Sequence, residues 1–305
     1  MIILICAAFG LWAWCRRNGN TDEPPICPGS LPLIGHAHLL CGDSVQLWNT
    51  FKEFSNESFK AGGVMSLSIG PRTVYVISDP EDFLTVANTC LEKDSFYEFG
   101  KEWIGEGLVT GTVPIWKEHR KLLNPAFSQV VLDGFLDVFN KQARRLVKDL
   151  EKEVGKGPFD HFVYTRHNAL ETICLTALGV DFTDKTILNS QYVNAVEQMF
   201  NVLVDRFQKL WLHNHFIYSF KKEKADYLNK NNPKKVEKMQ GLKFKPFMDL
   251  LLELAIEKGA FNDREIREHV DTMITVGHDT SASVLMYSML LVGSYPHVQE
   301  RIFEE

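Results

Sequence analysis

The sequence predicts a mainly α-helical protein with a small β-sheet near the N-terminus, an α+β arrangement. β-like runs occur only in the first quarter, at 64–69 and 73–77, and they flank Gly70-Pro71-Arg72 as in a hairpin with a three-residue loop. Later segments repeat apolar residues at three- and four-residue spacing, which indicates helices. These segments are 116–123, 135–154, 167–178, 193–212 and 245–258.

Composition sets limits on the function classes that remain open. The chain has 305 residues, 45% of them hydrophobic, and 33 basic against 39 acidic residues give a net charge of −6. We therefore expect no nucleic-acid partner, since such proteins usually carry a basic surplus. The six cysteines form no C-x-x-C pair, which argues against a disulfide scaffold and favours a cytosol-facing body. The lysine-rich stretch 221–245 is either a solvated surface or a docking site for an acidic partner.

The N-terminus differs from the rest of the chain. Residues 1–15 (MIILICAAFGLWAWC) contain no charge, and Arg16-Arg17 follows at once. We interpret 1–17 as a membrane anchor, although its apolar run is shorter than the about 20 residues of a typical span. A cleaved signal peptide is the alternative, but such peptides normally begin with basic residues, which are absent here. Four prolines then indicate a stiff linker over 18–33, which leaves 34–305 as the body.

The last long helix carries the most informative pattern. Asn262 followed by Glu265 predicts a capped start, and Gly293 before Pro296 predicts the end, so that the helix runs for about 45 Å. An apolar stripe along it is interrupted at mid-helix by small and polar residues that are poor or indifferent helix formers. The stripe with its interruption comprises Ile266, Val270, Met273, Ile274, Gly277, Ser281, Val284, Leu285 and Ser288.

Two interpretations of the mid-helix residues remain open from periodicity alone. In the first, Gly277 leaves room for a flat ligand, and the hydroxyl of Thr280 serves a ligand or water. In the second, Gly277 is a packing glycine, Thr280 is bonded to the carbonyl of Val276, and Asp279 is solvated. Local rules tend to be broken at functional sites, which keeps the first interpretation in view.

Two sequence blocks resemble known motifs of the cytochromes P450. Residues 276–281 (VGHDTS) resemble the oxygen-activating motif [A/G]-G-x-[D/E]-T-[T/S], and 265–272 (EIREHVDT) extend the match to insect-type members of family 4 and its clan. Residues 116–121 (WKEHRK) with 125–127 (PAF) resemble the W-x-x-x-R segment of the family's helix C. The blocks stand in the expected order, so the resemblance covers nearly the whole chain and implies the P450 fold.

The resemblance implies roles for individual residues. Trp116 and Arg120 match the pair that hydrogen-bonds a haem propionate; their i, i+4 spacing places them on one helix face, and a guanidinium suits a carboxylate. Gly277 matches the position that opens a groove beside the haem. Thr280 and Asp279 match the catalytic alcohol and acid that deliver protons to oxygen.

Val276 is a departure from the family pattern. It stands where alanine or glycine is usual and where many family 4 members have a glutamate that can bond covalently to haem. Valine cannot form that bond, so we expect non-covalent haem b.

The resemblance also implies a reaction and its partners. A haem-thiolate monooxygenase inserts one oxygen atom from O2 into an apolar small molecule such as a fatty acid, hormone or xenobiotic. Electrons come from NADPH through the FAD- and FMN-containing cytochrome P450 reductase, with cytochrome b5 as an optional partner. The expected location is the endoplasmic reticulum membrane, in contact with lipid through the N-terminal anchor, with the body on the cytosolic side.

Two family motifs have no counterpart in this sequence, the E-x-x-R pair and the F-x-x-G-x-x-x-C-x-G loop that holds the haem cysteine. We therefore expect a C-terminally truncated P450 domain without a metal ligand, inactive alone. The alternative is a short non-catalytic, membrane-tethered relative that acts only by binding. A P450-fold isomerase or dehydratase is disfavoured because Asp279 and Thr280 are both present.

Overall fold

The computed structural model describes residues 23–179, 190–213 and 247–304, together with positions 6, 7, 9–11, 13 and 218. Most of the predicted anchor and the lysine-rich stretch lie outside these residues. Within the described part, no helix combines the length and the apolar character that a bilayer crossing requires. The chain divides into two compact units, residues 1–92 with 208–211 and residues 93–207 with 212–305.

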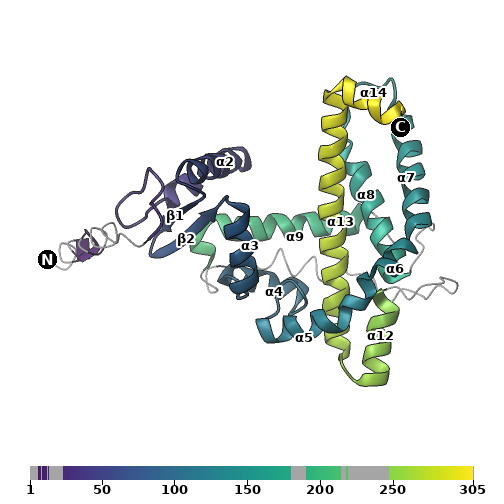
Figure 1. The fold of residues 1–305 in the computed structure, drawn as a ribbon, viewed down its shortest axis with the longest axis horizontal. Coiled ribbons are helices and arrows are strands. Elements are labelled where there is room, and N and C mark those ends of the chain that lie inside the picture. The colour runs from purple at the N-terminus through teal and green to yellow at the C-terminus, as the bar shows by residue number, and fades with distance from the viewer. Residues whose placement is uncertain are drawn as a thin grey trace. The chain divides into compact units, whose positions relative to one another are not determined.

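The chain is mainly helical with one small sheet, which confirms the predicted fold class (Figure 1). The first unit holds α2 (Ser44–Lys60), β1 (Val64–Ile69), β2 (Arg72–Ile77) and α3 (Pro80–Thr89). The principal helices of the second unit are α4 (Glu98–Ile104), α5 (Val113–Leu123), α6 (Gln129–Asp133), α7 (Leu136–Leu150), α8 (Phe162–Ile173), α9 (Ser190–Gln208), α12 (Phe247–Lys258), α13 (Asp263–Ser294) and α14 (Pro296–Glu304).

The hairpin is present, but its predicted loop length was wrong. β1 and β2 pair antiparallel with Ile69 opposite Arg72, so the loop has two residues, Gly70 and Pro71, instead of three. Gly70 has a φ of 57°, and glycine at the first position of a two-residue loop gives a turn whose twist matches that of the strands. Arg72 can therefore join β2, although the sequence suggested that it belonged to the loop.

The described part of the predicted linker packs against this sheet. Cys27 is buried with Phe54, Met65 and Leu67, and its N–H donates to the carbonyl of Ser66 at 2.9 Å. The ring of His36 is fully buried: Nε2 donates to the carbonyl of Cys27 at 2.8 Å, and Nδ1 accepts from the N–H of Ser68 at 3.0 Å. These bonds fix the segment along β1 and account for both ring nitrogens of His36.

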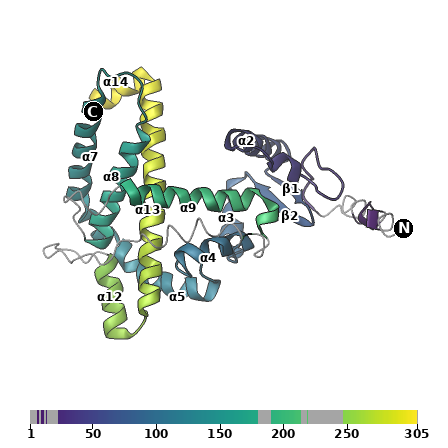
Figure 2. The ribbon, with the colours of Figure 1, turned by 180° about the vertical axis from the view of Figure 1, so that it is seen from behind.

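Helix α13 begins as predicted. The Asn262 side chain accepts from the N–H of Glu265, and the Glu265 side chain accepts from the N–H of Asn262, a reciprocal capping box. The helix has 32 residues and continues through Gly293 to Ser294, after which Pro296 opens α14. Both views of the ribbon show α8 lying along α13 in the second unit (Figures 1 and 2).

The buried face of α13 is not its apolar stripe. The buried residues recur at three- and four-residue spacing but are mostly polar: His269, Thr272, Thr275, His278 and Ala282. Several members of the predicted stripe instead line a cavity beside the helix. The apolar core of this unit packs against the first half of the helix, where it contacts Ile266, Val270 and Met273 of the stripe, and it borders the cavity. It is formed by Leu123, Phe247, Leu251, Leu254 and Phe261 with their neighbours.

Candidate functional site

Gly277 lies near the centre of α13, where Ile173 of α8 packs against it. A Cβ placed on Gly277 would come within 2.7 Å of Cδ1 and 2.8 Å of Cγ1 of Ile173, distances that real Cβ atoms do not show. Glycine within a helix costs about 1 kcal/mol relative to alanine, and here the close approach of α8 accounts for it. The same residue also forms part of a cavity wall. The two interpretations of Gly277 are therefore compatible.

Thr280 and Val276 lie on an accessible stretch of the same helix. The Thr280 hydroxyl donates to the carbonyl of Val276 at 2.7 Å, and the Val276 side chain is 40% exposed. Asp279 is half-buried, and its carboxylate has no hydrogen bond or ion pair among the described residues. The hydroxyl of Thr280 thus keeps its lone pairs free to accept a proton donor from outside the helix.

His278 is a buried residue within the motif that the sequence did not single out. It is fully buried, and its Nδ1 donates to the carbonyl of Ile274 at 2.7 Å. Burial is the main cause that lowers the pKa of this imidazole, so the ring is neutral near pH 7. His278 was the variable position of the motif, and its only sequence signal was its place at helical spacing from Thr275 and Ala282.

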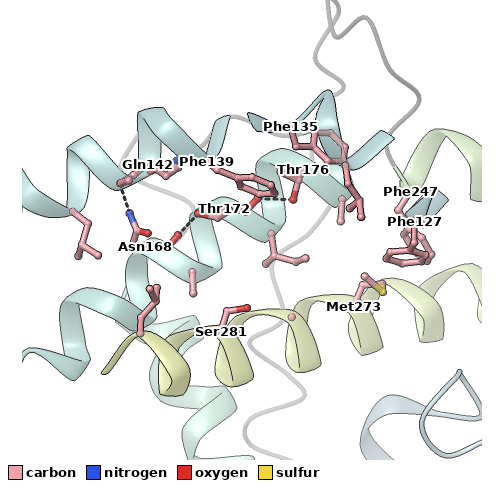
Figure 3. A pocket seen from close by; sticks show the side chains of 18 of the residues that line it. Phe127, Phe135, Phe139, Gln142, Asn168, Thr172, Thr176, Phe247, Met273 and Ser281 are labelled. Atoms are coloured by element: carbon pink, nitrogen blue, oxygen red, sulfur yellow. Dashed lines mark hydrogen bonds between the residues drawn. The ribbon is translucent and has the colours of Figure 1, made fainter. Parts of the chain in front are cut away.

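A cavity of about 460 Å³ lies between α7, α8 and α13 (Figure 3). Its volume is in the range of small-molecule sites. Three of its polar groups are used within the wall: Asn168 donates to the carbonyl of Gln142, Thr172 to that of Asn168, and Thr176 to that of Thr172. The wall is therefore largely apolar and rich in phenylalanine, with Phe127, Phe135, Phe139, Phe247, Leu132, Leu146, Ile173, Met273, Gly277, Ser281 and Leu285 among its residues.

Parts of the two sequence blocks line this cavity, namely Ala126 and Phe127 of the first block and Gly277 and Ser281 of the second. The other predicted site residues are not among the lining residues: Trp116, Arg120, Val276, Asp279 and Thr280. The W-x-x-x-R block lies on α5, with Trp116 half-buried and Arg120 exposed. Helix α5 leads directly into the short 3₁₀ turn Asn124–Phe127, whose last two residues line the same cavity as Gly277 and Ser281 of α13. In the described part of the chain, the Arg120 guanidinium has no ion-pair or hydrogen-bond partner. Segments about 150 residues apart in sequence thus share one cavity.

Comparison with known proteins assigns the family. The family model for cytochrome P450 matches residues 24–305. The chain belongs to the cytochrome P450 family. It is 30% identical to human cytochrome P450 4V2 over 321 aligned residues, and the alignment covers 96% of this chain and 61% of the human protein. It is 29% identical to cytochrome P450 4c3 of Drosophila melanogaster, with coverage of 91% and 58%.

A further relative, cytochrome P450 4c21 of Blattella germanica, is 30% identical, with coverage of 95% of this chain and 62% of its own length. The chain thus spans about three-fifths of the length of these relatives. The predicted membership of P450 family 4 is supported by the names of these relatives.

The family implies a haem, and the cavity residues fit one part of that group. An apolar, phenylalanine-rich wall suits the face of a porphyrin. Trp116 and Arg120 lie on α5 outside the cavity lining and carry an N–H donor and an unpaired cation, the groups that a propionate would need. The haem of a P450 also needs a cysteine thiolate as a ligand to its iron. No described cysteine lines the cavity, and burial raises the pKa of the Cys174 thiol to about 12, which keeps it protonated. The described residues therefore fit the macrocycle and its propionate but offer no thiolate.

Proposed function

We propose that this chain forms the haem-facing and proton-handling part of a haem-thiolate monooxygenase. The observation that carries the proposal is the meeting of Gly277 and Ser281 with the segment that follows Trp116 and Arg120 at one apolar cavity. Haem with a cysteine thiolate supplies the cleavage of the O–O bond when it is bound. The residues of this chain would hold the group, exclude water and move protons.

Arg120 and Trp116 would bind a propionate. A guanidinium forms short, charge-assisted bonds to a carboxylate, and the i, i+4 spacing presents both side chains to the same group. Val276 carries no nucleophile or acid that could bond to a haem methyl, so the haem would be held non-covalently as haem b. The apolar wall formed by residues such as Phe135 and Phe139 would keep water from the cavity.

Thr280 and Asp279 would deliver protons. The Thr280 hydroxyl donates to the carbonyl of Val276, so the same oxygen can accept a bond from a bound molecule without giving up that anchor. Asp279 is half-buried, which allows its carboxylate to exchange protons with water while it lies one residue from Thr280. An acid and an alcohol at this spacing would form a short proton path from solvent to a molecule bound beside Thr280.

The remaining parts of the proposal concern the whole enzyme. Its substrate would be an apolar small molecule such as a fatty acid, hormone or xenobiotic. Its electrons would come from NADPH through the flavin-containing reductase, with cytochrome b5 as an optional partner. Residues 1–17 would anchor the body to the cytosolic side of the endoplasmic reticulum membrane.

Fractionation of cells that express the chain with and without residues 1–17 tests the anchor. Equal recovery of both forms in the membrane fraction would count against it.

The test of the haem assignment is a titration of the purified chain with haemin, followed by the Soret band. We expect Arg120→Ala to weaken binding about tenfold or more, because a charge-assisted contact is lost. Lys121→Ala is the matched control, since it removes the same charge from the next exposed position of α5. Equal affinities of wild type and Arg120→Ala would contradict the propionate role. After reduction and addition of carbon monoxide, we expect no red-shifted thiolate band from this chain.

A further inference from the structure

Two histidines join α5 to α13 inside the second unit. Nε2 of His269 lies 3.0 Å from Nδ1 of His119, and the ring centroids are 4.8 Å apart. The two residues are 1% and 7% exposed. The ring of Phe261 meets both imidazoles edge-on at 5.2 and 5.0 Å, which closes the pair from water. The contact links positions 150 residues apart in the chain.

The surroundings fix the direction of this hydrogen bond. Nδ1 of His269 is buried and has no hydrogen-bond partner among the described residues. If His119 donated, a neutral His269 would carry its proton on Nδ1 as a buried N–H without an acceptor, which is rare in proteins. If His269 donates from Nε2, its Nδ1 holds only a lone pair. We therefore infer that His269 donates and that Nδ1 of His119 accepts.

We propose that the His269–His119 bond is a positioning contact that sets the rotation and the register of α5, and so sets the direction in which the Arg120 side chain leaves the helix. This proposal rests on the proposed role of Arg120 in haem binding. Arg120 directly follows His119, so any rotation of α5 about its axis moves both side chains together. α5 also contacts the apolar core through residues such as the fully buried Leu123, and apolar contacts are not directional. A hydrogen bond is directional, and it can hold the helix in one rotation.

The chemistry of the pair argues for positioning over stabilisation. Two buried imidazoles lose their hydration and leave one nitrogen unpartnered, so their net contribution to stability is small. Replacing both partners of a buried polar pair by apolar residues of similar size is often neutral for stability. A variant with leucine at both positions therefore separates the two roles, because it keeps the packing and removes the directional bond.

The test uses the full chain, haemin as the probe, and hydrogen exchange of the amides of α5. We expect His269→Leu and the double variant His119→Leu/His269→Leu to raise exchange in 113–123 and to weaken haemin binding about tenfold. His269→Gln keeps an N–H donor, so we expect it to stay within about threefold of wild type. The control is His36→Gln, which disturbs a buried, hydrogen-bonded histidine of the other unit; we expect it to leave haemin affinity unchanged.

Coupling to Arg120 completes the test. If the pair acts through Arg120, then adding His269→Leu to Arg120→Ala weakens binding no further, since neighbours that act as one unit are not additive. A His269→Leu chain with wild-type affinity, or full additivity with Arg120→Ala, overturns the proposal and leaves the haem assignment intact. If Arg120→Ala binds haemin with wild-type affinity, or if the wild-type chain binds no haemin, the haem assignment is overturned. The proposed effect of the His269–His119 pair on haem binding then fails with it.

Discussion

Gly277 and Ile173 face each other across the α8–α13 interface at a distance that excludes any larger residue. A Cβ on Gly277 would lie 2.7 Å from Cδ1 of Ile173. We therefore expect Gly277→Ala to lower the free energy of unfolding by about 1–3 kcal/mol, because overpacking outweighs the helix propensity that alanine gains. Urea denaturation of the purified chain measures the difference.

A second glycine of α13 supplies the control for this prediction. A Cβ added to Gly293 would meet no atom within 4 Å, so Gly293→Ala should be neutral or stabilise by about 1 kcal/mol. The double variant Gly277→Ala/Ile173→Ala should lose less stability than the sum of the two single variants, since Ile173→Ala removes the atoms that the new Cβ would meet. If both single glycine variants raise stability equally, the contact with Ile173 does not constrain position 277.

Local signals in the sequence were sufficient to predict α13 itself, but they did not predict which residues pack against it. Asn262 and Glu265 predicted the start of the helix because a capping box involves only residues three apart. The loop of the hairpin was predicted one residue too long because the pairing of Ile69 with Arg72 depends on the positive φ of Gly70. Nothing local indicates that Ile173 lies against Gly277, since that contact forms only when α8 packs on α13.

The buried histidines also show that contacts between distant segments could not be predicted from local sequence patterns. The motifs predicted Trp116, Arg120, Gly277 and Thr280 as site residues; of these, Gly277 lines the cavity, and the turn that follows Trp116 and Arg120 reaches it through Ala126 and Phe127. His269 and His278 were missed because a polar residue at helical spacing normally indicates a solvated face. Their burial depends on partners elsewhere in the fold: His119 lies on α5, and His278 packs on the face of α13 that meets α8.

The two faces of α13 near the motif should differ in access. Thr280 is exposed and His278 is fully buried, although they are two residues apart. We expect the thiol of Thr280→Cys to react with a maleimide at least about tenfold faster than the thiol of His278→Cys, because the second thiol reacts only after local opening. Peptide mapping by mass spectrometry separates these sites from the native cysteines. Equal rates would contradict the orientation of the helix.

The native cysteines should divide by burial in the same experiment. Cys41 and Cys90 are exposed, whereas Cys27 and Cys174 are buried. Burial raises the pKa of the Cys174 thiol to about 12, so very little thiolate is present at pH 8. We expect iodoacetamide to label Cys41 and Cys90 in the folded chain and Cys174 only after unfolding in urea. Rapid labelling of Cys174 in the native chain would reopen it as a candidate thiolate.

The buried pair of histidines should make stability depend on pH. Burial first, and then the neighbouring His119, lowers the pKa of His269 from 6.5 to about 4, against a smaller opposing effect of Glu268. Between these two values the unfolded chain binds more protons than the folded chain, so stability rises with pH across this window. Above pH 6.5 His269 is neutral in both the folded and the unfolded chain, and its titration costs no stability. As the pH falls from 6.5 toward 4, the stability of the folded chain decreases progressively.

Urea denaturation at several pH values between 4.5 and 7.5 tests this dependence. As the pH falls from 7.5 to 4.5, protonation of His269 should lower the free energy of unfolding of the wild-type chain by on the order of 1–3 kcal/mol. In His269→Leu this part of the loss should be absent. His278 also has a pKa lowered by burial, so part of the slope should remain in His269→Leu. If wild type and His269→Leu show the same slope, then His269 is not held neutral by the fold, and the direction of the bond to His119 would need to be reassigned.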